Sequence, residues 1–242
     1  MNRFYLPPDE WQVDCLTLVG DEAKHCSRVM RAKQGDMIEI FDGIGNAAYC
    51  IVESVQRDQV SCRIESKKTS PLPTHPITLC QAIPKGANMD LIVQKAVELG
   101  VSAIQPLISA HTVARPESAA KKRVKWQRIA LEASKQCGQN HLPAILEPAD
   151  FSAWLAKQLN FDLRLIAALD QKALHLNAYL SKQLAPGNIA LLIGPEGDFS
   201  ADEYEACFKA GFHPISFGNI VLRVETAAIY GLSVLHHELS EI

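Results

Sequence analysis

The sequence lacks the apolar runs that a membrane protein needs. No stretch in its 242 residues approaches the roughly 20 apolar residues of a transmembrane helix. The first ten residues, Met1–Glu10, also lack the apolar core of a secretory signal peptide. We therefore expect a soluble, cytoplasmic protein with no role at a membrane.

Two common catalytic motifs are missing as well. The chain has neither the Gly-x-x-x-x-Gly-Lys-Ser/Thr phosphate loop nor the Gly-x-Ser-x-Gly nucleophile elbow. Gly43–Ala48 does match the dinucleotide-binding pattern Gly-x-Gly-x-x-Ala. That fingerprint must open a helix, whereas Gly43–Ala48 leads into a β-rich segment. We interpret it as a hairpin turn.

Paired cysteines are also absent. The seven cysteines are scattered along the chain and form no Cys-x-x-Cys pair. An odd and scattered set is not typical of a disulfide framework or of a structural zinc site. We interpret these cysteines as small buried hydrophobic residues in a reducing compartment, and we expect no metal site.

Excess positive charge is missing too. The chain has 24 basic and 27 acidic residues, which gives a formal net charge of −3. The overall field is slightly repulsive to nucleic acids, so any RNA binding must come from a local basic patch. What the chain does have is a hydrophobic fraction of 48%, which is typical of a globular protein with a substantial core.

A proline-rich segment divides the chain. Ser70–Pro76 contains three prolines within six residues, and such a run continues neither a helix nor a central strand. We interpret residues 71–76 as a stiff linker between a first domain, residues 1–70, and a second domain, residues 77–242.

The first domain has the pattern of a small β-structure. Three short β-rich segments are expected to form strands: residues 37–41, 47–55 and 60–66. Residues 42–46 and 56–58 make plausible hairpin turns between them, and residues 21–31 have the pattern of a helix. We expect a small β-barrel or β-rich domain over residues 1–70.

The second domain alternates between strand and helix. Its strand candidates are residues 77–82, 103–107, 163–168, 189–193 and 214–217. Its helix candidates are residues 88–99, 120–137, 174–184, 201–210 and 225–239. Strands that alternate with helices predict βαβ units, and therefore an α/β fold with a mostly parallel sheet.

One loop after a buried strand has the features of a ligand site. The apolar run that ends at Ile193 leads into the tight turn Gly194–Gly197, and Ser200 with Glu203 then forms a capping box for the next helix. Open α/β sheets bind ligands at the carboxyl ends of their strands, and glycines there let a ligand approach the backbone. The alternative is a plain β-turn connector.

Two further strand-exit loops carry charged residues. In the loop that contains Gly218, Arg223 is suited to hold a phosphate or polarise a base carbonyl, and Glu225 is either an acid at a helix N-terminus or a catalytic group, with the first slightly favoured. Lys85 follows the first strand of the domain, where a solvated lysine is an equally good interpretation. The final helix, Thr226–Leu239, is apolar around most of its circumference, so it must be buried in the core or against a second subunit.

Basic residues recur at helical spacing in both domains. His25, Arg28 and Arg31 follow one another at i, i+3 and i+6. In the 121–137 helix, four basic residues lie opposite the apolar face: Lys121, Lys125, Arg128 and Lys135. The ordinary interpretation of each set is a solvated helix face, and an RNA-binding stripe is the sharper alternative.

Together these segments resemble one family along nearly the whole chain: the bacterial 16S rRNA (uracil(1498)-N(3))-methyltransferases, or ribosomal RNA small subunit methyltransferase E. The matching segments are His25–Arg31, Phe41–Gly43, Ala82–Gly86, Gln94–Gly100, Glu132–Gly138, Ile193–Gly197 and Leu222–Ala227. The resemblance implies a PUA-like β-barrel followed by an α/β domain of the SPOUT methyltransferase superfamily, with a trefoil knot. It also implies a homodimer that binds S-adenosylmethionine and acts on 16S rRNA of the small ribosomal subunit.

The resemblance also implies which residues form the site. The cofactor-binding set is Leu169, Ile193, Gly194, Pro195, Glu196, Gly197, Phe217, Gly218, Asn219 and Leu222. The RNA-binding set is His25, Arg28, Arg31, Lys85 and Arg115. Arg223 is the expected catalytic cation, which stabilises negative charge on the uracil, and Glu225 either orients Arg223 or acts as the base.

The sequence departs from the family pattern at several positions. Asp198 stands where a second glycine commonly follows Gly-Pro-Glu-Gly, while Ile220 and Gln139 stand where arginines are common. His111–Arg115 replaces a segment in which an Arg-Ser pair is more usual. Two alternatives stay open: a related SPOUT enzyme that modifies tRNA or a ribose 2′-hydroxyl, and a non-catalytic RNA-binding assembly factor.

Overall fold

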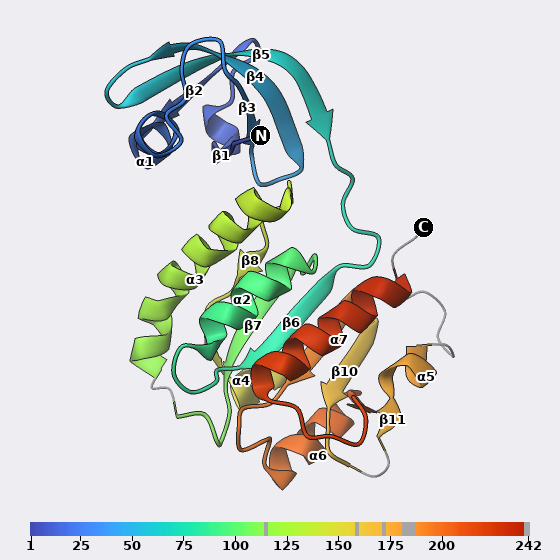
Figure 1. The fold of residues 1–242 in the computed structure, drawn as a ribbon. Coiled ribbons are helices and arrows are strands. Elements are labelled where there is room, and N and C mark those ends of the chain that lie inside the picture. The colour runs from blue at the N-terminus through green and yellow to red at the C-terminus, as the bar shows by residue number, and fades with distance from the viewer. Residues whose placement is uncertain (114–115, 158–159, 171–172, 181–186, 240–242) are drawn as a thin grey trace. The chain divides into compact units, whose positions relative to one another are not determined.

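The computed structural model describes residues 1–113, 116–157, 160–170, 173–180 and 187–239, with only the backbone described for residues 116–120. The chain forms two compact units (Figure 1). Unit 1 combines Met1–Leu72 with Ser134–Leu142, and unit 2 combines Pro73–Ala133 with Pro143–Ile242. Unit 1 therefore takes a short segment from the middle of the chain in addition to the N-terminal residues.

Unit 1 is built on a five-stranded sheet. Its strands are β1 (Arg3–Tyr5), β2 (Cys15–Val19), β3 (Met37–Phe41), β4 (Asn46–Val55) and β5 (Gln59–Thr69), and they lie in the order β1-β3-β4-β5-β2. β1 runs parallel to β3, and the other neighbours are antiparallel. The three strands predicted for the first domain are confirmed as β3, β4 and β5.

The turn between β3 and β4 shows why Gly43–Ala48 is no dinucleotide loop. The buried Asp42 carboxylate accepts hydrogen bonds from the backbone N–H groups of Ile44 (2.8 Å) and Asn46 (2.9 Å), which folds the chain back on itself. Gly45 has a φ of +113°, and a Cβ there would lie 2.5 Å from the His141 ring, so only glycine fits. The hairpin interpretation is confirmed.

The helix predicted over residues 21–31 is confirmed as far as Val29, but it is not a regular α-helix and it ends before Arg31. The chain forms a short α1 (Gly20–Lys24), then a π-helical turn, η2 (His25–Val29), closed by a hydrogen bond of 2.9 Å from the Met30 N–H to the His25 carbonyl. Arg31 follows with a φ of +54°, outside any helix. Because a π-turn changes the angular spacing of side chains, the i, i+3, i+6 pattern does not place these basic residues on one α-helical face.

Apolar side chains from all five strands fill unit 1, together with residues of α1 and η2. Three of the cysteines, Cys26, Cys50 and Cys62, belong to this core. Burial raises the pKa of the Cys26 thiol to about 11, and it raises those of Cys50 and Cys62 to about 12, so these thiols stay protonated at neutral pH. Cys80 and Cys207 are buried as well, Cys15 and Cys137 are exposed, and all seven thiols are free.

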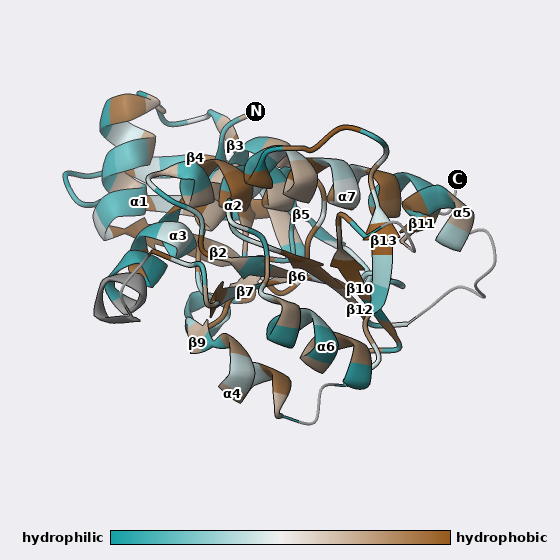
Figure 2. Ribbon diagram, turned by 90° about the horizontal axis from the view of Figure 1, so that it is seen from below, coloured by the Kyte–Doolittle hydropathy of each residue, from teal (hydrophilic) through white to brown (hydrophobic). Residues whose placement is uncertain are grey.

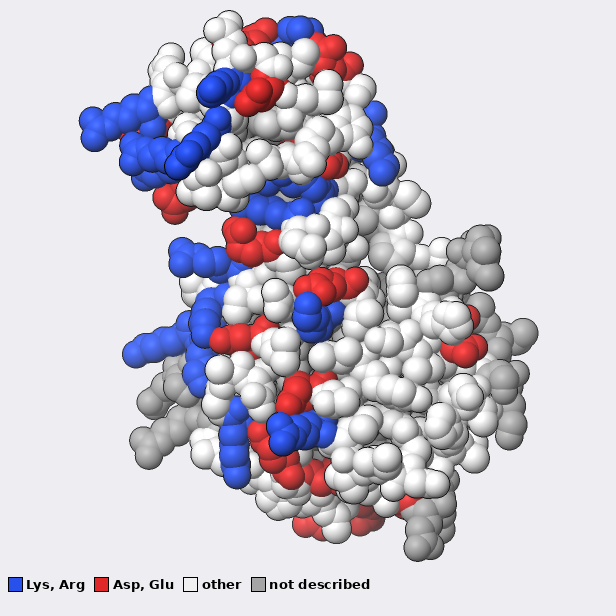
Figure 3. Space-filling view, viewed as in Figure 1, with Lys and Arg blue, Asp and Glu red and all other residues white. Residues whose placement is uncertain are grey.

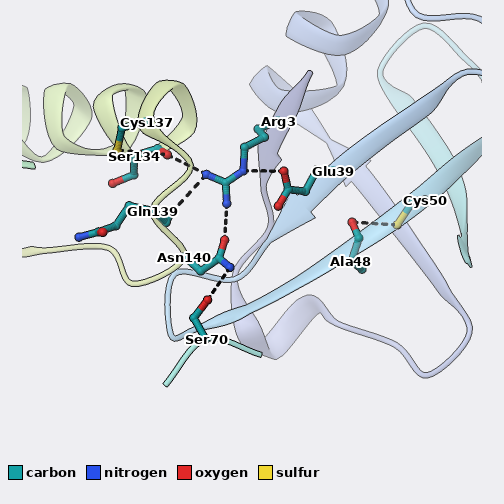
Figure 4. Close-up of polar contacts among 9 residues, drawn as sticks. All are labelled: Arg3, Glu39, Ala48, Cys50, Ser70, Ser134, Cys137, Gln139 and Asn140. Atoms are coloured by element: carbon teal, nitrogen blue, oxygen red, sulfur yellow. Dashed lines mark hydrogen bonds and ion pairs between the residues drawn. The ribbon is translucent and has the colours of Figure 1, made fainter. Parts of the chain in front are cut away.

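A buried arginine joins the N-terminal strand to the Ser134–Leu142 segment of the same unit. The Arg3 guanidinium pairs with Glu39 at 3.0 Å and donates to the carbonyl oxygens of Ser134 (2.8 Å) and Gln139 (3.3 Å) and to the Asn140 side chain (Figure 4). Its carbon Cζ also lies 4.4 Å from the centre of the Phe41 ring. We call these six residues the Arg3 cluster. Gln139, one of the departures from the family pattern, contributes to it through its backbone.

Unit 2 contains a second, entirely parallel sheet. Its strands are β6 (Ile77–Ala82), β7 (Ala103–Ile108), β8 (Ala144–Ile145), β9 (Ala149–Asp150), β10 (Leu163–Ala167), β11 (Leu174–His175), β12 (Ile189–Ile193) and β13 (His213–Ser216). The order is β11-β13-β10-β12-β6-β7-β8, with β9 beside β7. The predicted α/β class and parallel sheet are confirmed. The knot that the resemblance implies stays a prediction.

Helices cover both faces of this sheet. They are α2 (Asn88–Glu98), α3 (Pro116–Cys137), α4 (Phe151–Leu155), α5 (Leu176–Leu180), α6 (Ala201–Lys209) and α7 (Val224–Leu239). Figure 2 shows α2 and α7 on one side of the hydrophobic strands β6, β10 and β12, with α4 and α6 on the other. Within the described ranges, no helix has the length and apolar character to cross a membrane.

The predicted helix over residues 174–184 is wrong at its start. Leu174–His175 forms β11, which pairs with β13, and the helix begins only at Leu176. Residues 181–184 of that prediction lie outside the described residues. The short elements β8, β9 and α4 escape the sequence patterns because two to five residues show no clear periodicity.

Candidate active site

Three neighbouring strands deliver their carboxyl ends to one cavity. β13, β10 and β12 are adjacent and parallel in the sheet, so the loops that follow them emerge at the same edge. Residues after each of these strands line a cavity of about 530 Å³. That volume lies in the usual range of small-molecule sites, roughly 300–1,000 Å³.

Most of the predicted cofactor-binding residues lie around this cavity. Eight of them line it: Leu169, Ile193, Gly194, Pro195, Glu196, Phe217, Gly218 and Leu222. The two expected catalytic residues, Arg223 and Glu225, line it too. Gly197 and Asn219 are not in the wall, and a Cβ on Gly197 would instead lie 3.1 Å from the His111 side chain.

The loop after β12 is fixed by hydrogen bonds at both ends. The Asp198 N–H donates to the Pro195 carbonyl at 2.9 Å and closes a turn. The predicted capping box is confirmed: Ser200 Oγ accepts from the Glu203 N–H (3.2 Å), and Glu203 Oε2 accepts from the Ser200 N–H (2.9 Å). Hydrogen bonds therefore hold this loop on both sides of the part that faces the cavity.

The loop after β13 depends on a close contact with α7. The Phe217 ring packs 5.4 Å from the Tyr230 ring, measured between centroids. A Cβ on Gly231 would lie 2.9 Å both from Phe217 and from Leu191, so the absence of a side chain in α7 lets Phe217 reach its position in the cavity wall. Gly218 follows with a φ of +114°.

The loop after β6 and the first residue of α2, Asn88, are hydrogen-bonded to the cavity wall. The Lys85 N–H donates to Glu196 Oε1 at 2.9 Å, which joins this loop to the one after β12. Asn88 Nδ2 donates to Glu225 Oε2 at 3.4 Å, which joins it to the start of α7. The Lys85 side chain is exposed and does not line the cavity.

Arg223 and Glu225 lie on either side of the first residue of α7. Arg223 is exposed, and its carbonyl accepts the Ala227 N–H at 2.8 Å, so its backbone begins the helix. No acidic side chain among the described residues pairs with its guanidinium, which is therefore available to a ligand. Glu225 is half-buried in the first helical turn. This position suits both an acid that stabilises the helix N-terminus and a catalytic group.

The predicted RNA-binding residues are spread over both units. In unit 1, His25 packs edge-on against the Phe4 ring at 5.6 Å between centroids, and Arg28 lies 3.9 Å from Asp58. Arg31 is exposed beyond the π-turn. Arg115 lies outside the described residues.

Several cavity residues were not predicted from the sequence. They are Asn88, Ala167, Asp198, Ile215, Ser216, Val224 and Ala227. Most belong to a strand end or a loop that the glycine pattern had already marked, so extending each marked loop by two residues would have found them. Asn88 had a weaker signal, its position at the start of the helix after the β6 loop. The described residues contain no group of three or more His, Cys, Asp or Glu side chains placed to hold a metal ion.

Known proteins are similar in sequence to both units of this chain. Residues 70–236 match the family described as the RNA methyltransferase domain, and residues 18–65 match the RNA methyltransferase PUA domain. The ribosomal RNA small subunit methyltransferase E of Aquifex aeolicus is 30% identical over 241 residues, which cover 97% of this chain and 99% of the relative. The Bacillus subtilis protein of the same name is 29% identical over 249 residues, covering 98% of this chain and 97% of that protein.

Solved structures agree with the sequence comparison. A ribosomal RNA small subunit methyltransferase E from Neisseria gonorrhoeae, bound to S-adenosyl methionine, has a TM-score of 0.88 and 32% identity, with coverage of 98% and 97% of the two chains. A Legionella pneumophila protein in complex with bound SAM has a TM-score of 0.88 and 35% identity, with coverage of 97% and 96%.

The fold and the cavity at the strand ends thus define an RNA methyltransferase preceded by a PUA domain. Within that class, the chain belongs to the ribosomal RNA small subunit methyltransferase E family.

Proposed function

We propose that the protein transfers a methyl group from S-adenosylmethionine to N3 of a uridine in 16S rRNA of the small ribosomal subunit. The observation that carries the proposal is the cavity formed by three strand-exit loops, in a chain related over nearly its whole length to enzymes of that name. Eight of the ten predicted cofactor-binding residues and both predicted catalytic residues line this cavity, although they come from segments far apart in the sequence.

The residues present fit a nucleoside ligand of this kind. Gly194 and Gly218 have no side chain, so a ligand can approach the backbone closely there, while Leu169, Ile193 and Phe217 offer apolar surface. These residues would hold S-adenosylmethionine. When bound, it supplies an electrophilic methyl group on a positively charged sulfur.

The chemistry assigns a task to Arg223. N3 of uracil carries a proton, which must leave as the N3–methyl bond forms and the sulfur–methyl bond breaks, and the sulfonium becomes a neutral thioether. Negative charge therefore develops on the uracil carbonyl oxygens, and the Arg223 guanidinium at the cavity wall stabilises it. Glu225, held by Asn88, either orients Arg223 or accepts the proton.

The target atom also restricts the RNA. N3 lies on the Watson–Crick edge, so the uridine must be unpaired or turned out of its helix to reach the cavity. The protein must therefore hold the flanking RNA largely through its phosphates.

A basic face on α3 suits that need. Trp126, Ala130 and Ala133 are buried and fix the orientation of the helix. Three of the four basic residues predicted for its outer face, Lys121, Lys125 and Arg128, are exposed, and so is Lys122 one turn before Trp126. The fourth, Lys135, does not belong to an exposed face, because it is buried and pairs with Glu22. Figure 3 shows basic side chains gathered along the side of unit 2 where α3 lies. Because the whole chain is slightly acidic, this basic face is a local attraction for phosphate.

Replacing Lys121, Lys122 and Arg128 together with alanine is expected to weaken RNA binding and flatten its salt dependence. Each phosphate contact with single-stranded RNA contributes about 0.7 to the slope of log K against log salt, so the slope should fall by roughly 2. Titration of a 16S fragment containing the target uridine, at several salt concentrations, measures this. Lys209→Ala on α6, which removes an exposed lysine paired with Glu205, serves as the control and should leave the slope unchanged. If the slope is unchanged in the triple variant, these side chains of α3 contact solvent and not RNA.

The proposed reaction is tested with purified protein, labelled S-adenosylmethionine and small ribosomal subunits that lack the modification. Methylation at N3 blocks base pairing, so reverse transcription should stop at one uridine, and only when the donor is present. Label without a stop would indicate ribose methylation, and transfer to tRNA alone would indicate another substrate. No label from a folded protein would favour a non-catalytic RNA-binding factor.

Two further points belong to the same proposal. We expect a homodimer assembled through unit 2, supported by the apolar composition of α7, on which Tyr230 stays exposed in the single chain. The molar mass in solution, measured by light scattering, tests it.

The proposed substrate also implies a location in the bacterial cytoplasm, where ribosomal subunits are assembled.

A further inference from the structure

Asp198 is an unusual residue at the cavity wall. Its φ of +57° is one that residues other than glycine rarely adopt. Arg31 is the only other described residue besides glycine with a positive φ. A strained residue of this kind persists where its surroundings hold it firmly.

Hydrogen bonds on several sides hold Asp198 in place. Its Oδ1 accepts from the Tyr204 hydroxyl (2.8 Å) and from the Phe199 N–H (2.8 Å). Its backbone carbonyl lies 2.9 Å from His111 Nδ1, and its N–H bonds to Pro195. Burial raises the pKa of Tyr204, and the bond to Asp198 raises it further, so the phenol stays a proton donor to the carboxylate.

The cavity as a whole carries unbalanced negative charge. Three carboxylates line it, those of Glu196, Asp198 and Glu225, against the single guanidinium of Arg223, a formal excess of two negative charges. Each carboxylate is held by a neutral donor: the Lys85 N–H, the Tyr204 hydroxyl and the Asn88 amide, respectively. Among the described residues none of the three forms an ion pair, so their charge is left to act on whatever occupies the cavity.

We propose that Asp198 determines specificity by charge: it makes the site favour the cationic methyl donor over its neutral product, S-adenosylhomocysteine. The inference rests on the proposed function. The donor carries a sulfonium, an ammonium and a carboxylate, with a net charge of +1, whereas the product has lost the sulfonium charge and is neutral. A fixed carboxylate in a partly dehydrated cavity attracts the extra positive charge of the donor. The product lacks that charge and is not attracted in this way. The product then leaves more readily, and fresh donor replaces it.

The test compares binding of the two ligands rather than activity. Isothermal titration of the full chain gives Kd values for S-adenosylmethionine and S-adenosylhomocysteine in the wild type and in Asp198→Asn. The amide keeps an oxygen to accept the bonds from Tyr204 and Phe199 but removes the charge. The ratio of product Kd to donor Kd should fall by at least about 5-fold, through weaker donor binding, because two unit charges about 4 Å apart attract one another to that extent even in bulk water.

Two further variants and one further ligand test whether charge is the cause of the change in the ratio. Asp198→Gly removes the carboxylate, fits the positive φ without strain and should give the same fall in the ratio. Asp202→Asn removes an exposed carboxylate from the first turn of α6, away from the cavity wall, and should leave the ratio unchanged. Sinefungin, in which a carbon bearing an ammonium replaces the sulfonium, should follow the donor.

Three outcomes are distinguishable. Equal weakening of both ligands would show that Asp198 only shapes the loop, and an unchanged ratio would show that its charge is not felt; either overturns the proposal. If the folded wild type binds neither ligand, it is the proposed function that fails.

Discussion

Arg223→Ala is expected to lower the single-turnover rate of methyl transfer by about 10²–10³-fold, the usual effect of removing one group that stabilises developing negative charge. The guanidinium lies at the cavity wall and pairs with no acid among the described residues, so its charge is not committed to holding the fold. Rapid mixing of enzyme and donor with unmodified small subunits, followed by reverse transcription, gives the rate.

Binding measurements separate this role from a simple loss of affinity. The Kd for S-adenosylmethionine should change little in Arg223→Ala, because the expected interaction is with the uracil in the transition state. Arg223→Lys keeps the charge but loses the planar fork, and should recover part of the rate. Lys209→Ala, an exposed change on α6, should behave as the wild type. A near-normal rate in Arg223→Ala would remove Arg223 from the mechanism.

The sheet of unit 2 could be predicted closely because local pattern and tertiary role agree there. β6 and β12 begin and end at the predicted residues. Both are short apolar runs bounded by turn-forming residues, and central strands of a parallel sheet are buried on both faces. The loops after such strands must emerge at one edge, so glycine-rich strand exits in a sequence indicate a ligand site at that edge.

Other features follow from contacts that the local sequence does not reveal. The π-turn at His25–Val29 keeps His25 against Phe4, and a helical pattern alone cannot anticipate the change of register. The bond between Asp198 and Tyr204 joins a loop to the middle of α6, and nothing in the spacing of the two residues implies it. Asn88 reaches the site only because the β6 loop and the start of α7 meet in space.

The Arg3 cluster is the clearest case of this kind. Arg3 precedes the predicted strands by more than thirty residues, and the segment it holds, Ser134–Leu142, comes much later in the chain. As an isolated residue near the N-terminus, it would be taken for a solvated arginine. In the structure its side chain is only 7% exposed and that of Glu39 only 15%. A buried ion pair of this kind matters most when one of its members is removed.

Arg3→Ala is therefore expected to destabilise unit 1 by about 3–5 kcal/mol, the typical cost of leaving one charge of a buried pair without its partner. Glu39 would keep a carboxylate in a poorly hydrated position, and the carbonyl oxygens of Ser134 and Gln139 would each lose the bond from Arg3. Hydrogen exchange measured by mass spectrometry should show faster exchange in β1, β3 and the Ser134–Leu142 segment, while the strands of unit 2 keep their protection.

An exposed arginine in the same unit provides the matched control. Arg63 pairs with Glu53 and Glu65, but its side chain is 53% exposed, so Arg63→Ala should cost less than about 1 kcal/mol. Replacing Arg3 and Glu39 together with methionine removes both charges and should cost less than Arg3→Ala alone, because no carboxylate is left without a partner. Arg3→Lys tests the cluster if Arg3→Ala fails to fold. It keeps the positive charge but loses the forked hydrogen bonds to Ser134 and Asn140, so its loss of unfolding free energy should be intermediate. Equal effects of the Arg3 and Arg63 replacements would mean that burial adds nothing to this interaction, and that the Ser134–Leu142 segment is held to unit 1 by its other contacts.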